Sequence, residues 1–116
     1  MRYVLMICSD EKRVGAMSDE EGSAMLAEYG KFMEEMGQRG VLQGGERLQP
    51  TTEARTVRVD NGKVLTSDGP FAETKEQIGG YFIVECKDID EATEIAAKIP
   101  GARLGTIEVR PIWEMA

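Results

Sequence analysis

Two short runs of apolar residues, at positions 2–8 and 80–86, constrain the fold of this chain most strongly. Both are rich in the branched and aromatic side chains that favour β-strands. A strand that is apolar along its whole length must be covered on both faces, so it belongs in the middle of a sheet. In the second run, Phe82, Val84 and Cys86 alternate with Tyr81 and Ile83, which predicts two faces that both need cover.

Two amphipathic helices are predicted between the strands. Ser18 and Glu21 have the spacing of a capping box, and Asp88 and Glu91 repeat it. The apolar residues that follow at helical spacing are Met25, Tyr29, Phe32, Met33 and Met36 in the first helix and Ile89, Ala92, Ile95, Ala96 and Ile99 in the second. Methionines at this spacing form core more often than a cofactor or partner surface, so we expect core. The polar residues 9–17 are predicted to form a loop.

The remaining segments predict two edge strands and a hairpin. Residues 41–48 read as one edge strand, and residues 106–110 as another, because Pro111 is tolerated mainly at sheet edges. Asn61-Gly62, between alternating residues at 56–59 and 63–66, predicts a hairpin with a type I′ turn.

The order of these segments predicts an α+β fold class. It is a ferredoxin-like βαββαβ chain with a β-hairpin insertion, in which the first and third principal strands lie in the middle of an antiparallel sheet. Two helices cover one face of that sheet. The other face, with Tyr81 and Ile83, needs cover, and we expect a second copy of the chain to supply it as a homodimer.

Composition limits the partners and the chemistry. The 116 residues suit a single domain, 1–116, and 14 basic against 21 acidic residues give a net charge of −7. This balance opposes binding to nucleic acid or to anionic membranes, and no segment approaches about 20 apolar residues, so we expect a cytoplasmic protein. The chain has no histidine and no CxxC pair, so we expect no metal, no cofactor and no catalytic triad.

The two cysteines are expected to be inert. Cys8 and Cys86 each end an apolar run, where a thiol is more often a small buried hydrophobe than a redox group. Antiparallel central strands would place them at opposite ends of the sheet, roughly 20 Å apart, which is beyond disulfide reach.

A constrained turn precedes the second apolar run. Pro70 fixes its own backbone and keeps Gly69 out of the α region, and the Asp68 carboxylate is expected to accept nearby backbone N–H groups. Thr74 and Gln77 have capping-box spacing for one helical turn, and Gly79-Gly80 permits a close backbone approach. Either a well-made connection or a ligand-facing loop would fit this stretch.

The same stretch carries a resemblance. The run DGPFAETKEQIGGYF, with GGERLQP at residues 44–50, resembles the signature of the DGPF-domain proteins, a branch of the YCII-related family. The resemblance covers nearly the whole chain and implies a small bacterial protein that pairs into a dimeric α+β barrel. It implies little about chemistry. Relatives of the YCII type are thought to use a histidine–aspartate pair, which this chain without histidine cannot form, so Asp68 is a candidate only through the DGPF motif.

In the predicted topology, several charged residues share one rim of the sheet: Asp10, Glu46, Arg47, Asp68, Glu73 and Lys75. Carboxylates near one arginine could leave Asp68 as a catalytic proton acceptor while Arg47 holds a small anionic metabolite. The expected ligand-binding residues are Glu46, Arg47, Glu73, Lys75 and Tyr81. Such a site would suit lactone isomerisation or elimination, which relatives in the dimeric α+β barrel group perform. Alternatively, Arg47 pairs with Glu73 and the cluster only fastens the loop.

Three classes of function remain open. The first is a dimeric small-molecule binding protein or a proton-transfer enzyme of lyase or isomerase type, with its pocket at the DGPF loop. The second is a regulatory protein-interaction module, because DGPF proteins resemble genomic companions of extracytoplasmic-function sigma factors. The third is a structural oligomer without a ligand.

Overall fold

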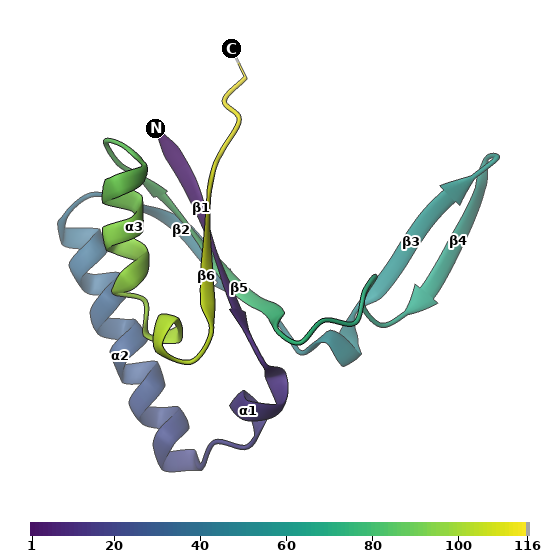
Figure 1. The fold of residues 1–116 in the computed structure, drawn as a ribbon, viewed down its shortest axis with the longest axis horizontal. Helices are drawn as coiled ribbons and strands as arrows, with labels where there is room; N and C mark the ends of the chain where they lie inside the picture. Colours follow the sequence, from purple (N-terminus) through teal and green to yellow (C-terminus); the bar gives the residue numbers. More distant parts are fainter. Residues whose placement is uncertain (116) are drawn as a thin grey trace.

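A four-stranded antiparallel sheet with helices on one face forms the body of the protein (Figure 1). The computed structural model describes residues 1–115. Its elements are β1 (Arg2–Ser9), α1 (Glu11–Gly15), α2 (Asp19–Gln38), β2 (Leu42–Arg47), η1 (Thr51–Glu53), β3 (Arg55–Asp60), β4 (Lys63–Asp68), β5 (Gln77–Glu85), α3 (Ile89–Ala97), η2 (Pro100–Arg103) and β6 (Thr106–Pro111).

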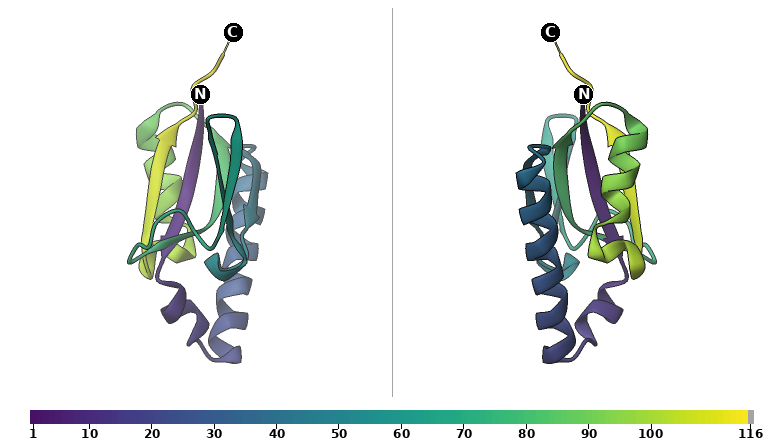
Figure 2. Two further views of the ribbon diagram at one scale, coloured as in Figure 1. Left: turned by 90° about the vertical axis from the view of Figure 1, so that its right-hand side faces the viewer. Right: turned by 90° about the vertical axis from the view of Figure 1, so that its left-hand side faces the viewer.

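The strand order confirms the predicted topology. The sheet runs β2-β5-β1-β6, so the two apolar strands are central and the strand that ends at Pro111 is at an edge. Helices α2 and α3 lie side by side on one face of the sheet, as both side views show (Figure 2). The chain therefore has the predicted ferredoxin-like α+β fold.

The core lies between the helices and one face of the sheet. Its largest fully buried side chains are Leu5, Met36, Val84, Ile95 and Ile99. Strand alternation directs the neighbours of Leu5 and Val84 to the opposite face of the sheet, which no helix covers. We call this the open face: it carries Val4, Met6, Tyr81 and Ile83, all half-buried.

Both predicted helix starts are present. The Ser18 hydroxyl accepts the Glu21 N–H at 3.1 Å, and the Glu21 carboxylate accepts the Ser18 N–H at 3.1 Å. The Asp88 carboxylate accepts the Glu91 N–H at 2.9 Å. These caps satisfy N–H groups that the first helical turn leaves free, so each helix begins where the sequence predicts.

The hairpin forms a separate two-stranded sheet, β3–β4, which we call the arm. Asn61 and Gly62 have φ angles of 49° and 77°, as a type I′ turn requires. The arm projects from the side of the sheet opposite the helices (Figure 1). Within residues 1–115, no helix is long and apolar enough to cross a membrane.

Two local predictions were wrong. Residues 9–17 do not form a loop throughout, because α1 occupies five of them, with the Asp10 carboxylate accepting the Lys12 N–H at 2.9 Å. Thr74 and Gln77 do not open a helical turn; Gln77 begins β5 and donates its side-chain amide to the Thr74 carbonyl. The first error missed a local cap at Asp10, whereas at Gln77 the strand pairing and the distant Glu11 N–H, which donates to the Gln77 side chain at 3.0 Å, outweighed the local pattern.

Candidate functional site

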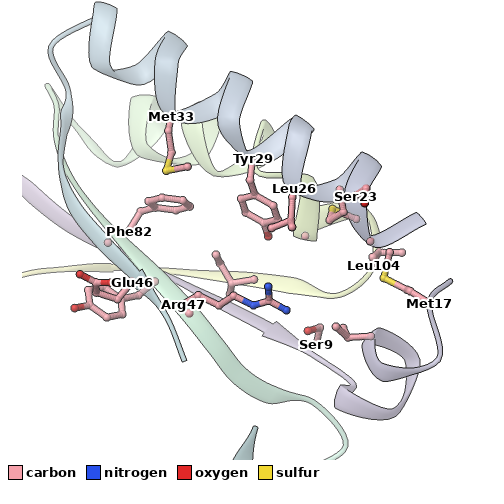
Figure 3. A pocket seen from close by; sticks show the side chains of 18 of the residues that line it. Ser9, Met17, Ser23, Leu26, Tyr29, Met33, Glu46, Arg47, Phe82 and Leu104 are labelled. Atoms are coloured by element: carbon pink, nitrogen blue, oxygen red, sulfur yellow. The ribbon is translucent and has the colours of Figure 1, made fainter. Parts of the chain in front are cut away.

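A cavity of about 750 Å³ lies between the amino-terminal half of α2 and the sheet (Figure 3). Its volume falls within the range of roughly 300–1,000 Å³ that is usual for small-molecule sites. The apolar side chains that line it are Ile7, Val14, Met17, Met25, Leu26, Tyr29, Met33, Phe82 and Leu104. The cavity exists because α2 continues beyond the part of the sheet that it covers.

The methionine stripe of α2 was predicted to be core, and this was wrong for part of it. Only Phe32 and Met36 are buried in α2. Met25 is half-buried and Met33 is 43% exposed, and both line the cavity. The pattern showed correctly which face of the helix is apolar, but it could not show how far the sheet would extend beneath that face.

Arg47 enters the cavity from the edge strand β2. Arg47 lies opposite Gly80 of β5, on the helix side of the sheet. Because Gly80 has no side chain, the guanidinium can extend across it into the space beneath α2 (Figure 3). Arg47 forms no ion pair within the described chain, residues 1–115, and it is the only basic residue there that lines this cavity.

Glu46 and Tyr81 also border the cavity but point elsewhere. They lie opposite one another on β2 and β5, one residue out of phase with Arg47 and Gly80. Strand alternation therefore directs their side chains to the open face. The structure brings three of the predicted ligand-binding residues, Glu46, Arg47 and Tyr81, to one end of the sheet, on its two different faces.

Tyr29 is the titratable side chain packed deepest in the cavity wall. Its ring stacks on that of Phe82 with 6.4 Å between centroids. Its hydroxyl lies against Gly101, where a Cβ atom would come within 2.7 Å. Burial raises the pKa of Tyr29, and the Gly101 backbone and the charges of Arg47 and Arg103 offset part of that rise. Tyr29 therefore stays protonated near neutral pH and can donate a hydrogen bond.

The other predicted site residues do not join this group in a single chain. Asp68 ends β4 at the base of the arm, where its side chain is 91% exposed and lies 3.6 Å from Arg55. Glu73 and Lys75 are exposed in the segment between β4 and β5. Asp10 caps α1. The prediction of one charged cluster at a shared rim was therefore wrong for the single chain, because the arm leads the chain away from the sheet before β5 returns.

The alternative contacts predicted for these charges are not formed either. Arg47 and Glu73 are not paired within residues 1–115, and the Asp68 carboxylate accepts no backbone N–H in that part of the chain. The DGPF turn is held instead through the backbone of Gly69: its N–H donates to the Ala54 carbonyl at 2.8 Å, and its carbonyl accepts the Thr56 hydroxyl at 2.9 Å. The φ of Gly69, 94°, explains why glycine occupies it.

Neither cysteine belongs to this site. Both are free thiols at opposite ends of the central strands, since Cys8 pairs with Ile78 while Cys86 follows the residue that pairs with Arg2. Burial raises the pKa of both thiols, which lowers the thiolate fraction and the reactivity at neutral pH. This agrees with the predicted inert role.

Comparison with known proteins gives the family. Residues 1–116 match the YCII-related domain. The chain belongs to the YCII-related family. An uncharacterised protein of Rhizobium meliloti (strain 1021) is 36% identical over 114 residues, which cover 97% of this chain and 92% of that protein. The match extends through the arm and the cavity-lining segments, so it concerns the whole YCII-related fold described above.

Proposed function

We propose that this YCII-related protein is a homodimeric small-molecule-binding protein that holds a small organic anion in the cavity beneath α2. One observation supports this proposal most strongly. Arg47 is the only basic side chain in residues 1–115 that lines the cavity, and it forms no ion pair within those residues. A guanidinium presents several N–H groups in a rigid fork that matches a carboxylate or phosphate. An anion at this place would give Arg47 its partner.

Binding is better supported than proton transfer. Asp68, the candidate proton acceptor, is exposed at the base of the arm and does not line the cavity of its own chain. A general base must come within hydrogen-bond reach of the proton that it removes. A catalytic role for Asp68 therefore remains a prediction that depends on a second chain bringing its DGPF segment to the cavity.

The homodimer is supported by the surfaces that the chain leaves uncovered. The open face presents the half-buried side chains of Val4, Met6, Tyr81 and Ile83, and the arm leaves the body on this side of the sheet (Figure 1). One face of the arm carries Val57, Val59 and Val64, which are 59%, 69% and 67% exposed. An isolated two-stranded hairpin is only marginally stable in water. We propose that a second copy packs its open face between them.

Thermal denaturation with a panel of small organic anions tests the binding function. The panel contains lactones, hydroxylated dienoic acids, monocarboxylates and phosphate esters, with neutral analogues of each. A compound present at a hundred times its Kd should stabilise the protein by about 2.7 kcal/mol. Arg47→Gln should weaken binding of the active compound about tenfold, because a charge-assisted hydrogen bond is lost.

Lys31→Gln is the matched control, since Lys31 is exposed on α2, does not line the cavity and undergoes the same change of charge. This control should bind the compound as the unsubstituted protein does. A panel in which no compound raises Tm would contradict the proposed function.

The DGPF motif also leads us to propose that the chain belongs to the DGPF branch and contacts an extracytoplasmic-function sigma factor. Affinity capture with that sigma factor as bait is the measurement. Recovery of no complex at micromolar concentrations of both proteins would argue against this contact.

A further inference from the structure

We infer that the ligand of this cavity is a monocarboxylic acid with an apolar body, of the size of a medium-chain fatty acid. Its carboxylate would pair with Arg47, and its body would lie along the methionine-lined underside of α2. The inference rests on the proposed binding function and adds the chemical class of the ligand. Three features of the cavity carry it: its walls, its charge and the access of Arg47 to its interior.

The walls favour an apolar body. Met17, Met25, Leu26 and Met33 project from α2 and the segment before it into the cavity, and Leu26 and Met33 are 59% and 43% exposed in the chain as it stands. A ligand that covers these side chains removes apolar surface from water, which is favourable in proportion to the area buried. Methionine side chains adapt to ligands of different shape, so they suit a flexible alkyl body.

The charges favour a single carboxylate. Arg47 is the only basic residue that lines the cavity within residues 1–115, and Asp19 at the start of α2 is an acidic residue that lines it on the same side of the sheet. A ligand with two negative charges would leave one of them without a cationic partner in a cavity that already has the Asp19 carboxylate in its wall. A monoanion avoids this repulsion and still satisfies the guanidinium fork.

The position of Arg47 leaves room for both parts of such a ligand. Its guanidinium points into the space beneath α2, with Met33 and Phe82 toward one end and Ser9 and Ser23 toward the other (Figure 3). The serine hydroxyls can donate to a carboxylate held near Arg47. At the end near Met33, the side chains of Met33 and Phe82 offer apolar contacts (Figure 3). An elongated molecule with one polar end fits a cavity that has Arg47 and two serines in part of its wall and apolar side chains along the rest (Figure 3).

Calorimetric titration of the full chain with a matched series of compounds tests the inference. The probes are hexanoate, octanoate and decanoate below their micellar concentrations, with octanol and octyl phosphate as eight-carbon comparisons. Each added methylene should increase affinity about threefold, somewhat less than full burial would give, because the cavity is open on one side. Octanoate should bind about tenfold more tightly than octanol.

Two variants separate the polar and apolar parts. Arg47→Gln should remove the advantage of octanoate over octanol and leave octanol binding unchanged. Leu26→Ser should reduce the gain per methylene and leave the advantage of octanoate over octanol in place. Lys31→Gln serves as the control for charge and should match the unsubstituted protein.

The outcomes distinguish this inference from the proposed function. Equal binding of octanol and octanoate, tighter binding of octyl phosphate, or no dependence on chain length would overturn the ligand class. If none of these acids binds but another small anion does so in an Arg47-dependent manner, the ligand class is wrong and the binding function stands. If no compound from either panel binds, both proposals fail.

Discussion

Gly45 and Gly80 show how single residues determine the edge of the sheet. A Cβ atom on Gly45 would come within 2.5 Å of the Tyr81 carbonyl oxygen, and one on Gly80 within 2.9 Å of the Glu46 carbonyl oxygen. Real Cβ atoms do not approach backbone so closely, so β2 and β5 can pair in this register only with glycine at these positions. The Gly79-Gly80 pair in the sequence predicted a close backbone approach, and the neighbouring strand accounts for it at Gly80.

The substitution Gly45→Ala tests this explanation. We expect it to lower the free energy of unfolding by about 1–3 kcal/mol, because the strands must move apart to admit the methyl group. Gly44→Ala is the control, since a Cβ there meets nothing within 4 Å, and it should change stability by less than about 0.5 kcal/mol. Urea denaturation at one fixed protein concentration measures both. Equal stability of the two variants would show that strand proximity is not the reason for Gly45.

At the scale of elements, the arm is a local structure whose attachment is not local. Its turn follows from Asn61-Gly62, and its strands follow from the alternation on either side. Its base, however, is held by α1: the Glu11 carboxylate accepts the Thr51 N–H and the Thr51 hydroxyl, both at 2.8 Å. Forty residues separate these partners, so no short sequence pattern predicts this contact.

We expect Glu11→Ala to loosen the base of the arm while the helix–sheet core remains intact. The Thr51 N–H loses a charged acceptor, and at a partly exposed site this costs about 1 kcal/mol of local stability. Amide hydrogen exchange in residues 48–56 should therefore become about five times faster. Glu34→Ala, which removes an exposed carboxylate of α2, should leave that exchange unchanged. Unaltered protection of residues 48–56 in Glu11→Ala would mean that Glu11 does not hold the arm.

The whole molecule is more extended than its length requires. The Cα radius of gyration is 16.2 Å, against about 13 Å for a compact domain of this size. The excess comes from the arm, which leaves the body on the side of the open face (Figure 1). The open face and the valine-bearing face of the arm are two apolar surfaces that the single chain leaves uncovered, and this supports the proposed homodimer.

We expect the protein to sediment at about twice its chain mass of 12.8 kDa and Val59→Asp to weaken the dimer by more than tenfold. Val59 is 69% exposed on the apolar face of the arm, and a carboxylate buried there without a partner would be unfavourable. Ser67→Asp, on the other face of the same arm, is the matched control and should remain dimeric. Sedimentation as a single chain at micromolar concentration would contradict the homodimer.

Most of the fold could be predicted, whereas the site could be predicted only in part. Arg47, Glu46 and Tyr81 were identified correctly as neighbours at one end of the sheet because pairing of β2 with β5 follows from the topology. Asp68, Glu73 and Lys75 were placed with them wrongly, because the position of a loop depends on the direction in which the arm leaves the body. The cavity residues Leu26, Met25 and Met33 were missed as site residues because an apolar stripe looks the same whether it meets a sheet or a cavity.

Local sequence patterns were sufficient to predict the caps of α2 and α3, the type I′ turn and the central positions of β1 and β5. Each depends on interactions among residues a few positions apart, or on how many faces of a strand are apolar and need to be covered. Three features became apparent only in the folded chain: where α2 extends past the sheet, which face of β2 carries Arg47 into the cavity, and where the arm points (Figure 1). These features depend on contacts between segments tens of residues apart, whose relative positions are not encoded in any local pattern.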